Sequence, residues 1–354
     1  MQIPRVASRL VFAAVTLARI LAPSGAAAAP VRVVASVPDL ADLARQVGGD
    51  DVEVTALVQG LQDPHSIEPR PSFIRALHDA DLFVVQGMEL EVGWAPTLLA
   101  SARNPRATPG GVGYLDASLG LAPLEMPPPG ATRALGDVHP FGNPHYLTDP
   151  LNGLRAAALL RDRLAELRPE RAAAFRERYA TFARALLERL VGPELAAGRD
   201  PDQLAREIEA DRDGFLGPQA PGSLGGWLGS VRPLRGAKAV EEHQYWAYFA
   251  RRFGVVLVAR LEPFPGIAPT TRHLAEVVEL IQAERVPIVL TSGYFDPRHA
   301  RWVAERTGAR IVPLAHQAGA RPGANDYLSA IDDNVRALVE ALGAGGAPVP
   351  GAQQ

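Results

Sequence analysis

Short apolar runs alternate with amphipathic helical patterns over the first part of the chain. A β-branched run at 31–36 precedes a helical pattern at 40–47, and a second strand is expected at 52–58. A helix around 73–77 and a third strand at 82–86 follow. Strands that alternate with helices at this spacing form βαβ units. The pattern therefore predicts an α/β lobe with a mainly parallel sheet.

Two helices without an intervening strand are expected in the middle of the chain. The first covers 151–167. The second carries a large apolar side chain at every third or fourth position, namely Phe175, Tyr179, Phe182, Leu186 and Leu190. This spacing predicts one long amphipathic helix of about six turns, or roughly 30 Å, whose aromatic stripe packs in the core.

A second alternation of strands and helices begins near residue 238. Its expected strands are 238–240, 255–261, 288–290 and 310–312, and its expected helices are 248–254, 271–283, 297–307 and 327–342. The predicted fold class is therefore α/β, with two α/β lobes joined by one long α-helix. The predicted boundaries are an N-terminal lobe at 30–168, a linking helix at 169–196 and a C-terminal lobe at 197–354.

The first residues of the chain have the pattern of a secretory signal. Two arginines precede an apolar run at 10–18 and a small-residue tract at 25–29, which predicts a signal peptide over 1–29 that is cleaved near Ala29. No other segment approaches the roughly 18 uninterrupted apolar residues that a transmembrane helix needs. We expect an exported protein without membrane insertion, most simply a periplasmic one.

Composition limits the chemistry that the chain can use. The 354 residues carry 21% charged side chains and a net charge of -3, and no basic patch predicts a nucleic-acid partner. Cysteine is absent, which excludes disulfides, thiolate metal sites, cysteine nucleophiles and a lipid-attachment cysteine. Any metal ion must therefore be held by nitrogen and oxygen ligands.

The segment 139–150 contains two imidazoles in a stretch that cannot form regular structure. Its prolines and glycine predict a loop that carries His139, Asn143, His145 and Asp149. Polar side chains of these types on one loop are typical of a functional site. The alternative is that Asn143 and Asp149 form turns and caps while the histidines are solvated.

Two further histidines follow predicted strands. His65 comes after the strand at 52–58 and His243 after the strand at 238–240, whereas His78 lies in a helical run and is expected at the surface. In open α/β sheets the binding crevice lies beyond the carboxyl ends of the strands. His65, His145 and His243 could converge only at a cleft between the lobes, where three imidazoles would suit Zn²⁺. Capping or solvated histidines are the alternative.

Three motifs surround these histidines. They are Asp63-Pro-His65-Ser-Ile-Glu-Pro69, Asn143-Pro-His145-Tyr-Leu-Thr-Asp149-Pro150 and His243-Gln-Tyr-Trp-Ala-Tyr248-Phe249. Together and in this order they resemble the ligand motifs of the zinc/manganese-type substrate-binding proteins of ABC importers, a periplasmic family with a rigid helical backbone between its lobes. The resemblance runs from about residue 31 to 342.

The resemblance implies a metal site in the interlobe cleft. It implies that His65 and His145 from the first lobe and His243 from the second are metal ligands, and that His139 is a cleft-edge group. The position of His243 is typically Glu in manganese-type members, so a third imidazole favours zinc while manganese stays possible. The implied function is high-affinity zinc binding and delivery to an ABC transporter permease, by a monomer without enzymatic activity.

The sequence departs from the family at the fourth ligand. The family usually has an Asp in an Asp-Pro-Leu turn after the last strand, but here 312–317 contains no carboxylate. We expect His316 to complete the coordination, with Asp296 or water as alternatives. The His-rich acidic loop of the family also has no counterpart, because 120–133 contains no histidine, and the sequence assigns that segment no function.

Two other classes of protein fit some of the same features. Three histidines with an open position also describe a catalytic zinc site, so a zinc-dependent hydrolase is one alternative. No HExxH helix is present, and Glu262 beside Pro263 is expected to be a structural hydrogen-bonding group. An adhesin-like interaction protein on the same scaffold is the third class.

Overall fold

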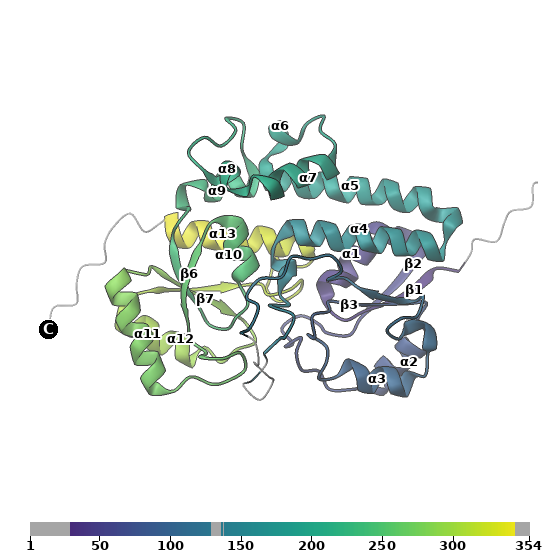
Figure 1. The fold of residues 1–354 in the computed structure, drawn as a ribbon, viewed down its shortest axis with the longest axis horizontal. Helices are drawn as coiled ribbons and strands as arrows, with labels where there is room; N and C mark the ends of the chain where they lie inside the picture. The colour runs from purple at the N-terminus through teal and green to yellow at the C-terminus, as the bar shows by residue number, and fades with distance from the viewer. Residues whose placement is uncertain (1–28, 129–135, 137, 344–354) are drawn as a thin grey trace, which may run out of the picture.

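The computed structural model describes residues 29–128, 136 and 138–343. Two four-stranded sheets lie side by side, and each is covered by helices (Figure 1). Apart from Ala29, the predicted signal peptide lies outside the described residues. Within the described ranges, none of the helices has the length and apolar character needed to cross a membrane.

The first sheet has the strand order β2-β1-β3-β4 and its strands pair in parallel. Its strands are β1 (Val31–Ala35), β2 (Val52–Ala56), β3 (Leu82–Val85) and β4 (Tyr114–Asp116), and its helices are α1 (Pro38–Gly48), α2 (Pro71–Asp79) and α3 (Ala95–Ala102). The sequence predicted the first three strands. It missed β4, because three residues are too few to show a period, and it also missed the eight-residue helix α3.

The second sheet repeats this arrangement in the order β6-β5-β7-β8, again with parallel pairing. Its strands are β5 (Lys238–Glu241), β6 (Val256–Arg260), β7 (Ile288–Ser292) and β8 (Arg310–Leu314), and its helices are α10 (Ala247–Phe253), α11 (Thr271–Glu284), α12 (Arg298–Thr307) and α13 (Tyr327–Gly343). Two α/β lobes with parallel sheets are thus confirmed. The carboxyl ends of the strands of each sheet carry the loops that form the site.

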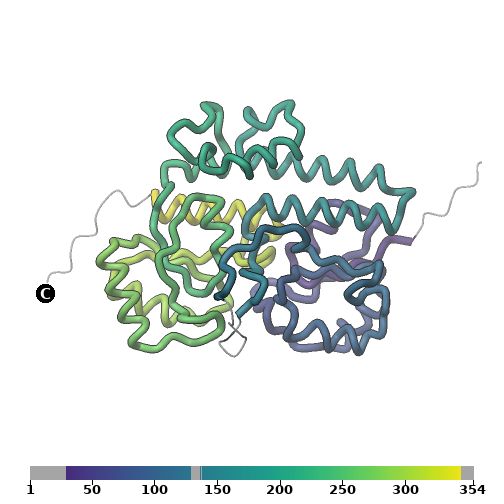
Figure 2. The backbone as a smooth tube through the Cα atoms, viewed as in Figure 1, coloured from purple at the N-terminus to yellow at the C-terminus, as the bar shows by residue number. Residues whose placement is uncertain are grey.

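Helices α4 (Pro150–Leu167) and α5 (Ala172–Val191) connect the lobes and lie along one side of the molecule (Figure 2). Helix α5 packs on α1 in the first lobe and on α9 (Gly226–Val231) beside the second. Its predicted apolar stripe is buried, as at Phe175 and Leu186. The short helices α6 (Pro193–Ala196), α7 (Pro201–Ala210) and α8 (Arg212–Leu216) follow it. The exact lobe boundaries at 168 and 196 stay predictions.

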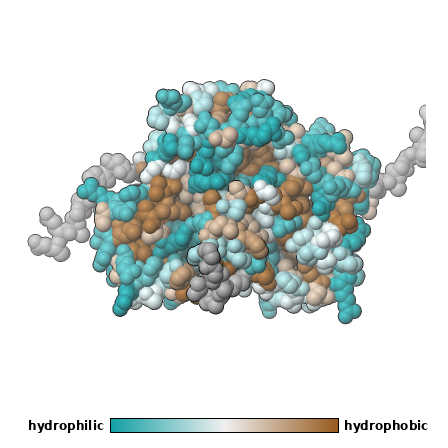
Figure 3. All heavy atoms as spheres, in the orientation of Figure 1, coloured by the Kyte–Doolittle hydropathy of each residue, from teal (hydrophilic) through white to brown (hydrophobic). Residues whose placement is uncertain are grey.

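One continuous apolar core passes through both lobes. It joins side chains of the first sheet, such as Val33 and Val84, to those of α5 and to Ile288 and Leu290 of the second sheet. Each fully buried Val, Leu or Ile contributes roughly 1.5–3 kcal/mol of transfer free energy. On the face drawn in Figure 3, hydrophilic side chains predominate over the α6–α8 region, and apolar ones lie in several places over the lobes. The shared core holds the two sets of strand ends in a fixed relation.

Candidate metal centre

Three histidine side chains meet between the lobes. His65 lies in the loop from β2 to α2, His145 immediately precedes the short helix η4 (Tyr146–Thr148), and His243 follows β5 by two residues. One ring nitrogen of each lies within 4.8 Å of those of the other two. The ring centroids are 5.0 Å apart for His65 and His145, 5.6 Å for His65 and His243, and 5.8 Å for His145 and His243. The structure therefore brings together three of the four predicted ligands.

These imidazoles are buried, and some of their nitrogens lack partners. The side chains of His65 and His243 are 6% and 4% exposed, and His145 is 1% exposed. Within the described part of the chain, Nε2 of His65 and both ring nitrogens of His145 have no hydrogen-bond partner. An unsatisfied buried polar group costs about 1–3 kcal/mol. A cation bound between the rings would satisfy these nitrogens, so the donor set fits a metal ion.

Carboxylates contact the Nδ1 atoms of two of the rings. Asp63 Oδ1 lies 2.8 Å from Nδ1 of His65, and Glu262 Oε2 lies 2.7 Å from Nδ1 of His243. A proton on each Nδ1 makes these contacts hydrogen bonds and leaves each Nε2 with a free lone pair. Such outer partners fix the tautomer and orientation of metal-binding histidines and raise their basicity.

The pairing of Glu262 extends the role that its sequence position indicated. Glu262 accepts a hydrogen bond from the Gly266 backbone N–H at 3.0 Å, as a structural residue would, but the same Oε2 also faces His243. The two residues follow different strands, β5 and β6, and are 19 positions apart. No local spacing in the sequence indicates this pair.

His145 is positioned by stacking and by its backbone. Its ring lies 3.7 Å from the ring of Tyr245 at an interplanar angle of 20°, and its N–H donates to Asn143 Oδ1 at 2.8 Å. Burial, and then the neighbouring imidazoles of His65 and His243, hold the pKa of His145 well below its ordinary value of 6.5. The ring is thus kept neutral, which is the form that binds metal ions.

A buried ion pair fixes the loops of the two lobes relative to each other. Arg252 on α10 is fully buried, and its Nε donates to Asp149 Oδ1 at 2.8 Å. Asp149 also caps α4 by accepting a hydrogen bond from the Leu151 N–H at 3.0 Å. Removing one partner of a buried pair costs about 3–5 kcal/mol. Asn143 and Asp149 therefore do form the turn and the helix cap that were considered for them. These contacts position His145, which is buried and not solvated.

His316 lies near the three imidazoles but outside their group. It follows β8, its Nε2 lies 3.3 Å from the Gln62 carbonyl oxygen, and its ring contacts Tyr245 and Tyr294. Burial lowers the pKa of His316 to about 4, so this ring is neutral as well. Its role as the fourth ligand stays a prediction.

Asp296, the alternative for the fourth position, and His139, the expected cleft-edge group, differ in burial. Asp296 is 61% exposed at its side chain and pairs with Arg298 on the same turn. His139 is buried, and its ring centroid lies 5.3 Å from that of His65 and 6.5 Å from that of His145. His139 thus borders the cluster from the first lobe.

Glu125 is a residue of the site that sequence reasoning missed. Its Oε2 accepts hydrogen bonds from Asn143 Nδ2 at 2.8 Å and from Gln244 Nε2 at 2.9 Å, and its carboxylate pairs with Arg260 of β6. It therefore joins the residue two positions before His145 to the residue next to His243. The segment 120–133 was assigned no function, because a single Glu in a Pro-rich stretch gives no recognisable pattern.

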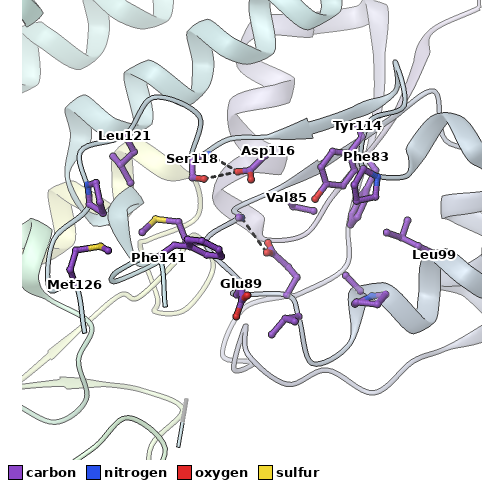
Figure 4. A pocket seen from close by; sticks show the side chains of 18 residues that line it. Phe83, Val85, Glu89, Leu99, Tyr114, Asp116, Ser118, Leu121, Met126 and Phe141 are labelled. Atoms are coloured by element: carbon purple, nitrogen blue, oxygen red, sulfur yellow. Dashed lines mark hydrogen bonds between the residues drawn. The ribbon is translucent and has the colours of Figure 1, made fainter. Parts of the chain in front are cut away.

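Two cavities adjoin this region, and only the smaller one reaches the histidines. A cavity of about 360 Å³ is lined by His139, His145 and His243, with Glu125 and Arg260 at its wall. A larger one of about 630 Å³ lies in the first lobe between side chains such as Phe83, Leu99 and Phe141 (Figure 4). Its wall is mainly apolar and includes no histidine. The imidazoles, rather than cavity size, mark the metal centre.

The chain is similar to known proteins over most of its length. A family described as "Zinc-uptake complex component A periplasmic" matches residues 33–190 and 230–341. The chain is 24% identical over 361 residues to the high-affinity zinc uptake system protein ZnuA of Paracoccus denitrificans, covering 90% of this chain and 96% of that protein. It is 22% identical to the zinc-binding lipoprotein AdcA of Streptococcus pneumoniae, covering 84% of this chain but only 53% of AdcA.

Solved structures with a similar fold include a ZnuA protein. A crystal structure of ZnuA superposes with a TM-score of 0.64 at 23% sequence identity, covering 88% of this chain and 99% of that one. At this level of identity the similarity establishes the two-lobed fold.

Proposed function

The chain belongs to the family of periplasmic zinc-uptake complex A components, and from that premise we propose that it binds Zn²⁺ between its lobes and delivers it to the permease of an ABC importer. His65, His145 and His243 are the ligands, and the zinc ion is cargo. The family consists of transport components rather than enzymes, which supports the expectation that the chain has no catalytic activity.

One observation carries the proposal. Three imidazoles from both lobes bring a ring nitrogen each within 4.8 Å of one another, and the nitrogens of His65 and His145 that face this space have no other partner within the described ranges. Zinc binds imidazole nitrogen at about 2.0–2.1 Å and is usually tetrahedral, so small shifts of these rings would complete three bonds. Because both lobes contribute, a bound ion also links them.

The donor set favours zinc over manganese. Mn²⁺ prefers carboxylate and water oxygens, whereas imidazole nitrogen suits zinc. The carboxylates of Asp63 and Glu262 contact the Nδ1 atoms of His65 and His243, so they support these ligands and do not bind the ion themselves. Manganese-type binding is therefore the second candidate and should be weaker.

The place of action and the partner follow from the family. We infer a periplasmic location, because the family description is periplasmic and the first 29 residues have a signal-peptide pattern. We infer a single protomer per zinc ion, because all three imidazoles come from one chain. The partner is the permease that receives the ion.

Metal content and thermal stability test the proposal. Protein exported to the periplasm and purified without added metal should carry close to one zinc ion, and competitive titration should rank Zn²⁺ above Mn²⁺. A ligand that binds only the folded state adds RT ln(1 + [L]/Kd), on the order of 4 kcal/mol at a thousandfold excess over Kd. An unfolding temperature that does not respond to zinc at pH 7.5 would count decisively against the site.

A further inference from the structure

The cavity of about 360 Å³ beside the imidazoles runs from buried to exposed side chains. Among the residues that line it, His145 and His243 are buried, whereas Met126 and Phe264 are 56% and 48% exposed. Each lobe contributes one residue to each of these pairs. The cavity is therefore a route between the lobes for an ion that enters or leaves the site. This inference rests on the proposed function, because it concerns how zinc reaches that same site.

Elsewhere, buried contacts hold the lobes together. Gln317, which follows β8 in the second lobe, is buried and donates through Nε2 to the carbonyl oxygens of Gly60 and Gln62 at 2.7 and 3.1 Å. These oxygens belong to the loop that leads to His65. One continuous apolar core also runs through both lobes. Wide separation of the lobes would break these contacts and expose the core, so exchange of the ion calls for a local opening on the cavity side.

Glu125 crosses from the first lobe to the second at this cavity. Its carboxylate pairs with Arg260 of β6, and its Oε2 accepts hydrogen bonds from Gln244 Nε2 at 2.9 Å and from Asn143 Nδ2 at 2.8 Å. The side chains of Glu125 and Arg260 are 22% and 36% exposed, although they line the same cavity as the buried imidazoles. The pair therefore lies on the solvent side of the histidines.

The partners of Glu125 keep other contacts when its carboxylate moves away. Arg260 Nε still donates to Glu241 Oε1 at 2.6 Å, and Asn143 Nδ2 still donates to the Gln244 carbonyl oxygen at 3.1 Å. Partly exposed ion pairs contribute little to stability, because water solvates the separated charges. This contact can therefore open while the loops that carry the imidazoles stay in place.

The backbone at Glu125 is held in an uncommon conformation. Its φ is +51°, in the left-handed region that few non-glycine residues adopt. The preceding residue is fixed on both sides, because the Leu124 N–H donates to the Tyr248 hydroxyl at 3.0 Å and the Leu124 carbonyl oxygen accepts from the Asn143 N–H at 2.9 Å. Such a conformation persists only where surrounding contacts determine it, and it is frequent at switch regions. Loss of the side-chain contacts would let this backbone relax.

We propose that Glu125 is the gate of the zinc site. With its carboxylate on Gln244 and Arg260 it closes the cavity over the imidazoles, and when it swings away it opens a path for the ion between lobes that otherwise stay together. Glu125 is not one of the proposed ligands. The gate therefore sets the rates at which zinc enters and leaves, and it changes both rates by a similar factor.

Stopped-flow kinetics on the full-length mature protein test this gate. Glu125→Asp keeps the negative charge beside the cavity but is one methylene shorter, so its carboxylate no longer reaches both partners. Mixing zinc-free protein with Zn²⁺ and a fluorescent indicator gives the association rate, and mixing loaded protein with excess chelator gives the release rate. Both should rise at least about threefold while Kd stays within about twofold. Glu207→Asp, which shortens one side of an ion pair with Arg199, should leave both rates unchanged.

A cross-link provides the opposite test. The chain has no cysteine, so Glu125→Cys/Gln244→Cys places its only two thiols on the two sides of the gate. A short bis-maleimide added to the zinc-loaded protein bridges them, and mass spectrometry checks the bridge. The bridged protein should release zinc at least about tenfold more slowly than the unbridged double variant. The unbridged variant should release zinc faster than the wild type.

The outcomes separate the gate from the proposed function. Wild-type rates in Glu125→Asp, or equal release from the bridged and unbridged double variant, overturns the gate. Faster release with unchanged association, and hence a weaker Kd, also overturns it, because Glu125 would then only position His145 through Asn143. Each of these results leaves zinc binding itself intact. Absence of zinc from the wild-type protein, or unchanged affinity in His145→Ala, would instead refute the proposed function.

Discussion

The two lobes have sheets of the same strand order, but they place different chemistry at equivalent strand ends. The edge strand β2 is followed by the loop of His65, whereas the equivalent edge strand β6 is followed by Glu262. One loop supplies an imidazole of the candidate metal centre and its own carboxylate partner, Asp63. The other supplies only a carboxylate, which supports an imidazole from the neighbouring strand end.

The central strands differ in the same way. After β5 comes His243, which faces the metal centre. After the equivalent strand β1 comes Asp39, whose Oδ1 accepts a hydrogen bond from the Ala318 N–H of the second lobe at 2.7 Å. The end of β5 thus carries a residue of the candidate metal centre, and the end of β1 carries a residue that contacts the other lobe. The duplicated scaffold provides equivalent positions, and the side chains divide binding and support between them.

The largest expected effect comes from removing His65 of the first lobe or His243 of the second. His65→Ala and His243→Ala should each weaken zinc binding by roughly a hundredfold or more, about 2.7 kcal/mol, because each removes a ligand of the proposed site. Competition with a chromophoric chelator measures the Kd, and His78→Ala, on the surface of α2, is the matched control. Near wild-type zinc affinity in His243→Ala would mean that the first lobe binds the ion alone. The proposal that both lobes contribute ligands would then be wrong.

Asp39 should make the stability of the zinc-free protein depend on pH. Burial raises the pKa of this carboxyl to about 7, opposed by the Ala318 N–H and assisted by Asp42. A folded-state pKa above the unfolded value of 3.8 means that the stabilisation is fully present below pH 3.8 and is lost as pH rises through about 7. Between pH 5 and 7 the unfolding free energy of the wild type should fall by about 2 kcal/mol relative to Asp39→Asn.

Chemical denaturation of zinc-free protein at pH 5, 6 and 7 measures this difference. The exposed Asp50→Asn variant, near the end of α1, should follow the wild-type profile. Parallel profiles for wild type and Asp39→Asn would mean that Asp39 is ionised in the folded protein. The contact between the lobes would then carry a charge at Asp39, whereas a pKa of about 7 keeps this carboxyl mainly protonated at pH 5 and 6.

The two carboxylate partners should differ in importance because they differ in burial. The Glu262 side chain is 12% exposed and that of Asp63 is 38% exposed. Loss of an outer-shell partner of a metal-binding histidine typically costs 10–100-fold in affinity, so Glu262→Gln should weaken zinc binding by at least about tenfold. Asp63→Asn should cost less, because water can replace part of its hydrogen bond to His65. Equal losses in the chelator assay would show that burial does not set the contribution.

Sequence reasoning succeeded where the signal is local. Strand patterns followed by His65 and His243, and the Pro-rich loop around His145, indicated that the three histidines could converge between two α/β lobes, and the resemblance to the family implied that they are metal ligands. Asp63 was part of a recognisable motif, because it is two residues from its partner. Its hydrogen bond uses only the loop that carries both residues.

What sequence reasoning missed depends on tertiary contacts. Glu262 faces His243 only because β5 and β6 are neighbours in the sheet, and Glu125 reaches Arg260 from 135 residues away. Strand β4 has three residues, too few for a period, and pairs with β3 only in the folded sheet. The position of His316 relative to the three imidazoles likewise depends on where the loop after β8 packs against Gln62. No spacing of residues along the sequence indicates any of these contacts.

The smallest effect should come from Glu125, which bridges the lobes at the cavity next to the site. Glu125→Gln keeps a group that can accept from Asn143 and Gln244 but removes the ion pair with Arg260, whose other partner Glu241 remains at 2.6 Å. Partly exposed pairs contribute about 0.2–1 kcal/mol and are screened by salt. Zinc release to a chelator, followed by stopped flow, should therefore be a few-fold faster in Glu125→Gln at low salt and similar to the wild type at high salt. Glu207→Gln, which removes the pair with Arg199 far from the cleft, should leave the rate unchanged. If Glu125→Gln releases zinc at the wild-type rate at low salt, the contact is structural, and other contacts between the lobes, such as those of Arg252 and Asp39, hold them together.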